Sequence, residues 1–271
     1  MALLSIIILG LLAMFDQTKR AFTTGMTQVD VLESGRAAME ILSREVSQMY
    51  PAPYDSNAVT FYAEIAPVAP LWQPLPGNNT RERRNLLEEM FFLTRGTNTW
   101  SGIGYWVGAP DSGSIPVATA NGWGTLYRSH VNTVFQGLVA YPWQLYGAYY
   151  NFNVRTQRMN RIIDGVVHFK VRAYDPNGVW ITNNLPAKTD IRPIQLSTYA
   201  TNEVEFYRFT NNAVPAFLEL ELGVLEERTL ARVKSIPDPV ARRNYLRDQV
   251  GRVHIFRTRV PVRNVDPLAY Q

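Results

Sequence analysis

The sequence contains no cysteine. Disulfide bonds and thiolate metal sites are therefore excluded, and the fold must be stabilised by packing. Charged residues make up only 18% of the chain against 46% hydrophobic residues, which argues against intrinsic disorder. The net charge is +4, but lysine and arginine are spread along the chain with acidic residues close to most of them. We therefore expect no nucleic-acid-binding stripe.

The short motifs of the common enzyme classes are missing as well. There is no GxSxG, no P-loop and no GxGxxG, and the glycines of Trp100–Gly104 lack a phosphate-binding context. The three histidines, His130, His168 and His254, are far apart and form no HxxxH pair, so they are interpreted as structural or surface residues. We expect no enzymatic activity, no metal, no cofactor and no small-molecule substrate.

Three segments leave a chemical alternative open. Glu219 and Glu221 share one face of an expected strand, so they form either a paired-carboxylate hydrolase site or a solvated face near arginines. Asp111–Ser114 resembles part of a calcium loop without its remaining acidic ligands. The aromatic segment Tyr141–Tyr150 is either a carbohydrate or partner surface, or loop packing over the core.

The most distinctive segment is the apolar run Ala2–Phe15, which only Ser5 and Gly10 interrupt. A membrane span needs ~20 apolar residues, so the run is short for one. A cleaved signal peptide is disfavoured, because nothing basic precedes the run and no small-residue cleavage site follows it. The helical pattern continues without proline until residue 51, so the run opens a much longer helix.

The second half of this helix is amphipathic, and its apolar stripe predicts packing on a folded domain. The stripe consists of Val29, Leu32, Met39, Leu42, Val46 and Met49. As one helix, residues 2–49 would be roughly 70 Å long. The segment 23–25, Thr-Thr-Gly, has low helix propensity and is where we expect any bend. We divide the chain into an apolar membrane or filament helix, 1–24, and a globular domain, 25–271.

The rest of the chain predicts short strands, loops and helical pieces. Strands are expected at Val59–Ile65, Met90–Leu93, Ile103–Val107, Val166–Ala173, Val204–Phe209, Phe217–Leu222 and Val253–Val262, which are rich in β-branched and aromatic residues. Arg81–Glu89 reads as helix-like, and Pro239–Val250 as a helix capped by Asp238. The expected fold class is α+β, with the long helix packed on an antiparallel sheet.

The N-terminal segment ALLSIIILGLLAMFDQTKRAF, followed by an amphipathic helix, resembles the region just after the prepilin peptidase site of type IV pilin-like proteins. The family's basic leader, cleavage glycine and early glutamate are absent from this sequence. We expect Met1 to be an internal methionine of the helix, because upstream residues would also supply the missing length of a membrane span.

Further segments resemble the J-type minor pseudopilins of type II secretion systems. Ile103–Val107 followed by Gly124–Arg128 resembles that family's strand pair ending in Leu-x-Arg, and Ile163–Trp180 resembles its later strand and turn. Val214–Leu222 and Phe256–Arg263 resemble its last strands. The similarity is greatest to the pilin-like group called Verru_Chthon cassette protein C.

This resemblance implies a domain of the pseudopilin type and a non-enzymatic subunit of a secretion or pilus-like filament, placed near its tip. It implies other pilin-like subunits as partners, and a single-pass inner-membrane location with the domain in the periplasm or cell exterior. The apolar residues expected to contact lipid or neighbouring helices are Leu3, Leu4, Ile6, Ile7, Ile8, Leu9, Leu11, Leu12, Met14 and Phe15. The alternative is a membrane-anchored extracytoplasmic binding protein or enzyme whose helix is a simple anchor.

Overall fold

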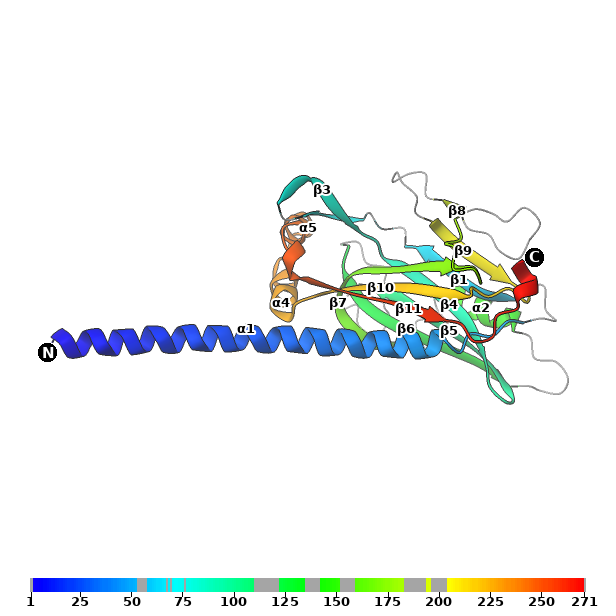
Figure 1. Ribbon diagram of the computed structural model, residues 1–271, viewed down its shortest axis with the longest axis horizontal. Helices are drawn as coiled ribbons and strands as arrows, with labels where there is room; N and C mark the ends of the chain where they lie inside the picture. Colours follow the sequence, from blue (N-terminus) through cyan, green and yellow to red (C-terminus); the bar gives the residue numbers. More distant parts are fainter. Residues whose placement is uncertain are drawn as a thin grey trace.

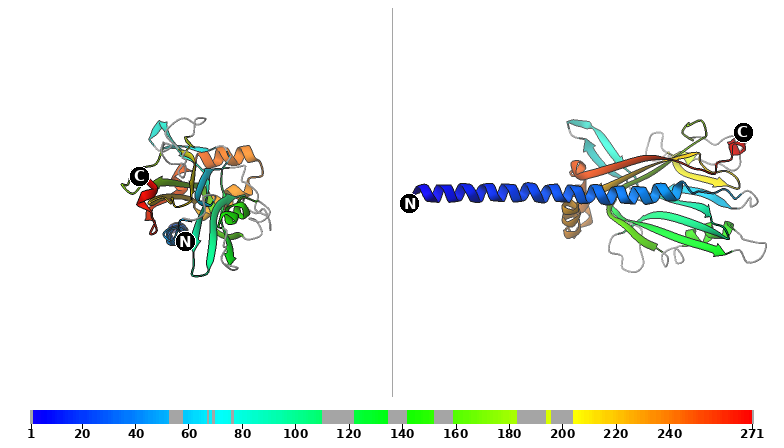
Figure 2. Two further views of the ribbon diagram at one scale, coloured as in Figure 1. Left: turned by 90° about the vertical axis from the view of Figure 1, so that its right-hand side faces the viewer. Right: turned by 60° about the horizontal axis from the view of Figure 1, so that its bottom comes forward.

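The computed structural model has a long helix, α1 (Ala2–Val46), followed by a body made mostly of antiparallel strands (Figure 1). The residues that the structure describes are 2–52, 58–66, 68, 70–75, 77–109, 122–134, 142–151, 159–182, 194–195 and 204–270. The first half of α1 projects beyond the body, and the second half runs along it (Figures 1 and 2).

Helix α1 continues without interruption through residues 23–25, where we expected any bend. Good helix formers on both sides outweigh the local cost of about 1 kcal/mol for one glycine. Its 45 residues span about 68 Å at ~1.5 Å each. The helix ends at Val46, and Met49 beyond it forms an antiparallel bridge with Thr94.

Nine strands form one sheet in the order β11-β10-β7-β6-β5-β4-β1-β9-β8, and β2 and β3 form a separate hairpin. The strands are β1 (Val59–Ile65), β2 (Leu71–Leu75), β3 (Asn78–Asn85), β4 (Glu88–Arg95), β5 (Thr99–Gly108), β6 (Gly124–Val134), β7 (Met159–Tyr174), β8 (Ile194–Gln195), β9 (Val204–Thr210), β10 (Phe217–Leu225) and β11 (Val253–Pro261). Every strand pair is antiparallel.

The long strand β7 is where the sheet curls. Its first half pairs with β6 and its second half with β10. The second half of β7 no longer pairs with β6. There, Leu87 forms a parallel bridge with Phe169, so the beginning of β4 reaches β7 across the sheet. The sheet is thereby rolled into a half-barrel.

Helices cover both faces and one end of this sheet. The docked half of α1 shares the largest core cluster with β7, β10 and neighbouring strands, while α2 (Trp143–Tyr150) packs on the other side against β4 and β5. The short helices α4 (Glu227–Ser235) and α5 (Pro239–Arg247) lie with β2 at the end from which α1 projects (Figure 1). Two single turns, η1 (Val250–Arg252) and η2 (Pro267–Tyr270), complete the described elements.

The structure corrects the predicted fold class. The described part of the chain is mostly antiparallel sheet, curled into a half-barrel, and the helices other than α1 have no more than nine residues. An α+β domain of the pseudopilin type is therefore wrong for this body. The long helix itself forms, but it contacts the body only through its C-terminal part.

Part of this error comes from Arg81–Glu89, which we expected to be helix-like. It instead completes β3 and begins β4, because cross-strand pairing with β2 and β1 overrides the local propensity of charged residues. The expected helix at Pro239 does form as α5, and the Asp238 carboxylate accepts a hydrogen bond of 2.7 Å from the Ala241 backbone N–H.

Candidate functional site

The projecting half of α1 exposes a continuous series of large apolar side chains. Their exposed fractions range from 49% for Ile8 to 68% for Met14, and the set comprises Ile7, Ile8, Leu9, Leu11, Leu12, Met14 and Phe15. The side chains of Leu3, Leu4 and Ile6 lie outside what the structure describes. Burying one such side chain is worth roughly 1.5–3 kcal/mol, so a partner that covers several of them gains on the order of 10 kcal/mol. Soluble monomers rarely expose an apolar surface of this extent.

The docked half begins two residues later than its sequence pattern predicts. Met39, Leu42, Val46 and Met49 are buried, Leu32 is half-buried, and Val29 is 58% exposed. Val31 is the first residue of α1 that the structure shows buried in the core. Between residue 16 and residue 30 the helix therefore has no burying contact with the body in the side chains described.

Gly35 lets α1 approach β11 closely. A methyl group built at Gly35 would lie 2.2 Å from Cε2 of Phe256, so the aromatic ring occupies the space that any side chain would need. Phe256 pairs with Leu222 of β10 across the sheet, which places its ring on the face that α1 covers. Sequence analysis placed Phe256 on a strand but gave no sign of its contact with Gly35, 221 residues away in the sequence.

A half-buried ion pair fixes the C-terminal end of α1 to the sheet. The Arg128 guanidinium lies 2.8 Å from Glu45 at Nη2 and donates from Nε to both carboxylate oxygens. The Tyr105 hydroxyl donates to the same carboxylate at 2.5 Å. Burial raises the pKa of Tyr105, and the Glu45 charge raises it further. Burial alone would lower the pKa of Arg128, but its hydrogen bond to Glu45 leaves that pKa raised. The side chains of Arg128 and Glu45 are only 20% and 14% exposed.

The carboxylates proposed as an alternative hydrolase pair are saturated by cations. Arg172 Nη1 lies 2.7 Å from both Glu219 and Glu221, and Arg257 Nη2 lies 2.7 Å from Glu219. Hydrogen bonds from His168 and Arg172 lower the pKa of Glu221 to about 2. Burial raises the pKa of Glu219, but the two arginines lower it by more. Neither carboxyl group holds a proton at neutral pH, so neither can act as the general acid of a glycosidase.

His168 belongs to this charged cluster as a neutral ring. Its Nδ1 accepts a hydrogen bond from the Leu86 backbone N–H at 3.1 Å, so the proton resides on Nε2 and faces Glu221 at 3.3 Å. Burial lowers the pKa of His168, which is consistent with this tautomer. His254 faces the buried Glu226 at 3.4 Å.

His130 lies apart on β6, and burial lowers its pKa. Within the described residues, no three acidic, histidine or cysteine side chains gather to hold a metal ion. Asp111–Ser114 lies outside the described part of the chain.

The glycines of Trp100–Gly104 make room for α2. A methyl group at Gly104 would lie 2.0 Å from the Tyr149 ring, and one at Gly102 would meet Phe91 and Leu145. Tyr149 is buried, while Trp143 and Tyr150 are 46% and 64% exposed. The described part of the aromatic segment thus both packs on the core and leaves two rings at the surface. Tyr141 lies outside the described residues.

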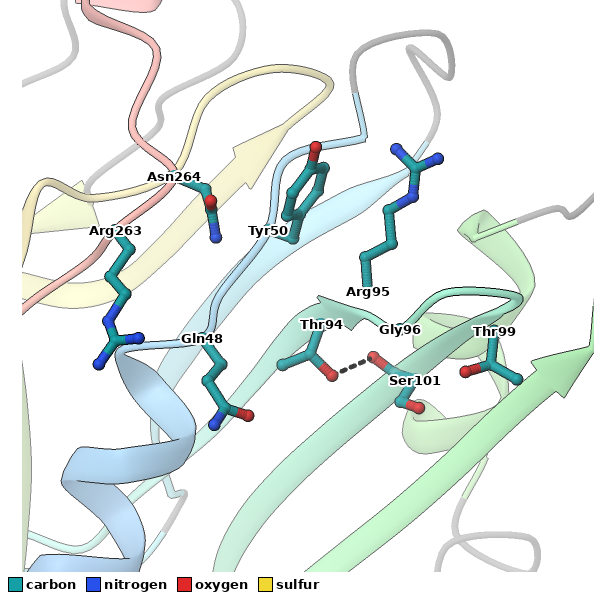
Figure 3. Close-up of a pocket in the computed structure, with 9 residues that line it drawn as sticks. All are labelled: Gln48, Tyr50, Thr94, Arg95, Gly96, Thr99, Ser101, Arg263 and Asn264. Atoms are coloured by element: carbon teal, nitrogen blue, oxygen red, sulfur yellow. Dashed lines mark hydrogen bonds between the residues drawn. The ribbon is translucent and has the colours of Figure 1, made fainter.

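A polar cavity of about 490 Å³ lies beyond the end of α1 (Figure 3). It is lined by Gln48 after the helix, by the β4–β5 turn, and by Arg263 and Asn264 after β11. Asn264 donates to the Met49 carbonyl at 2.9 Å, and the Arg95 guanidinium stacks over Tyr50 and Trp100. In Figure 3 the guanidinium groups of Arg95 and Arg263 point in different directions. The cavity therefore offers separate hydrogen-bonding groups and no convergent anion clamp.

No family model matches the chain, and no curated protein matches it. In the part that the structure describes, no helix combines the length and apolar character that crossing a membrane requires. The features with a clear physical consequence are the exposed apolar half of α1 and the contacts that hold its other half to the body.

Proposed function

We propose that this chain is a structural subunit of a pilin-like filament, of the kind found in type II secretion and type IV pilus systems. The observation that carries the proposal is the division of α1 into an exposed apolar half and a half fixed to the body by Gly35, Glu45 and the buried stripe. The apolar half is held in a bilayer before assembly and packs against the equivalent helices of neighbouring subunits afterwards.

The resemblance of the N-terminal segment and of five body segments to pilin-like sequences supports the same proposal. The fold class of the body contributes nothing to it. The contacts that fix α1 add a mechanical argument, because a subunit held through its helix must transmit force from the helix to the domain. The Glu45–Arg128 pair and the Gly35–Phe256 contact lie where that force would pass.

The test is self-association of the full-length protein. We expect replacement of Ile8, Leu12 and Phe15 by glutamine to abolish concentration-dependent assembly, because these residues share one face of the helix. Sedimentation velocity in mild detergent, followed by detergent removal, measures the assembly. The matched control is Val179→Gln, since Val179 is 62% exposed on the body. Assembly that survives the triple replacement would exclude the apolar half as the assembly surface.

The second candidate is an anchored binding protein, which the polar cavity of Figure 3 favours, since its volume falls in the range of ligand sites. The two functions differ in one readout. A filament subunit assembles with copies of itself or with other pilin-like subunits when co-expressed, whereas a simple anchored binder remains monomeric in detergent and in vesicles.

A further inference from the structure

The end of the body from which α1 projects is strongly basic. Residues 227–252, which form α4, α5 and η1, contain seven arginine or lysine residues against three carboxylates. This segment alone thus carries a formal charge of +4, equal to that of the whole chain. We call this surface the basic end, defined by Arg228, Arg232, Lys234, Arg242, Arg243, Arg247 and Arg252.

Among the described residues, carboxylates compensate three of the seven cations of the basic end, and one of these is Arg247, which lies 3.9 Å from Glu82. Glu226 is buried and lies 3.2 Å from Arg252. Asp238 caps α5, and Asp164 lies 3.4 Å from Lys234. The side chains of the exposed Arg228 and Arg232 make no ion pair or hydrogen bond with any described residue. Arg242 donates to the Ile236 carbonyl, a neutral group that fixes the guanidinium without cancelling its charge.

The basic end has a defined position relative to the apolar half of α1. Helix α4 contacts α1, and α4 and α5 lie at the end of the body from which α1 projects (Figures 1 and 2). The interface of a bilayer that holds the apolar half of α1 lies across the helix and therefore faces these arginines.

The helix between the apolar run and the body remains uncovered in the side chains described. Val31 is the first residue of α1 buried in the core, fifteen residues after Asp16, which is about 22 Å at ~1.5 Å per residue. The headgroup layer of a bilayer, about 5–8 Å thick, fits within this stretch. Phe22 and Met26 are 69% and 53% exposed, so apolar side chains continue from the apolar run toward the body.

We propose that the basic end binds the anionic headgroups of a phospholipid bilayer while the apolar half of α1 is embedded in it. This inference rests on the proposed function, since it requires an embedded helix. The lipid surface is favoured over an acidic protein because the basic end lies at the end of the body from which the apolar half of α1 projects. The contact holds the domain upright on the membrane before assembly and is released when the subunit is withdrawn into a filament.

The experiment measures flotation of the full-length protein with vesicles of phosphatidylcholine alone or mixed with phosphatidylglycerol. A lysine or arginine near an anionic surface contributes about fivefold in affinity. We therefore expect Arg228→Gln combined with Arg232→Gln to lower binding to the mixed vesicles about 25-fold, and high salt to have the same effect. Binding to phosphatidylcholine alone should not change. Circular dichroism checks that the variant is folded.

The matched control is Arg208→Gln combined with Arg263→Gln, which removes two exposed arginines elsewhere on the body. Equal binding to both vesicle types, unaffected by the Arg228 and Arg232 replacements, overturns the inference and leaves the embedded helix intact. Failure to bind either vesicle overturns the embedded helix as well. An Arg228 and Arg232 variant that keeps its vesicle binding but loses self-association assigns the basic end to a contact between subunits and overturns the lipid contact.

Discussion

Arg128 and Glu45 illustrate how a single pair positions the helix that carries the proposed function. The pair joins the last turn of α1 to β6, and Tyr105 adds a third hydrogen-bonding group from β5. A buried pair need not add net stability over apolar packing, but its partners depend strongly on each other. Its role here is to fix the rotation of α1 about its own axis.

We predict that Arg128→Met destabilises the protein by about 2 kcal/mol, because it leaves the half-buried Glu45 carboxylate without a cation. Urea unfolding followed by tryptophan fluorescence measures the change. Glu45→Gln in the same background should recover a large part of it. The control is Arg161→Met, whose side chain is 62% exposed beside Asp164 and should cost under about 1 kcal/mol. Equal losses in the two variants would contradict the argument.

At the scale of elements, the docking of α1 depends on a close approach to β11. Gly35 is unfavourable inside a helix by about 1 kcal/mol relative to alanine, so its presence there has a packing reason. That reason is the Phe256 ring, which fills the space beside it.

Two glycines of the same helix should respond oppositely to alanine. Gly35→Ala should destabilise the protein by about 1–3 kcal/mol, because the new methyl group overlaps Phe256. Gly25→Ala should be neutral or stabilising by up to about 1 kcal/mol, because nothing lies within 4 Å of the added carbon. Thermal unfolding of both variants in one buffer provides the comparison. Phe256→Leu combined with Gly35→Ala should recover part of the loss, and a Gly35→Ala variant as stable as the parent would refute close docking.

The sequence indicated most elements but not how they combine. Val59–Ile65 and the α5 cap followed from local signals, namely β-branched residues and an aspartate before Pro239. Arg81–Glu89 was misread because its charges favour a helix locally, while its partner strands lie elsewhere in the chain.

The docking contacts could not have been predicted either. Glu45 meets Arg128 across 83 residues, and no local pattern encodes such a pairing. The resemblance singled out the Leu-x-Arg segment that contains Arg128, but nothing in the sequence indicated Glu45 as its partner. The apolar half of α1 was predicted from the sequence, because its composition alone distinguishes it from the rest of the chain.

For the molecule as a whole, acid stability should reflect the cluster between β7, β10 and β11. Burial lowers the pKa of His168 from 6.5, so the unfolded chain takes up this proton first and stability falls as the pH drops below about 6.5. The pKa of Glu221 is lowered from 4.5 to about 2, so its contribution is present above pH 4.5 and is lost as the pH falls toward 2.

We expect urea unfolding at a series of pH values to show both steps. Glu221→Gln should remove the step between about pH 4.5 and 2, which is worth on the order of 2–3 kcal/mol. The exposed Glu227→Gln on α4 is the control and should leave the profile unchanged. An unaltered acid profile in Glu221→Gln would show that the cluster does not control acid stability.

The position of α1 in the chain has a consequence for synthesis. The helix is made before the strands that it packs on, chiefly β7, β10 and β11, and the last of these is completed only at Pro261. Native contacts separated by more than 200 residues form late, and the exposed apolar surface is prone to aggregation until they do. During translation the nascent helix therefore remains undocked until most of the chain has been made. An insertion machinery that binds it early would prevent its aggregation.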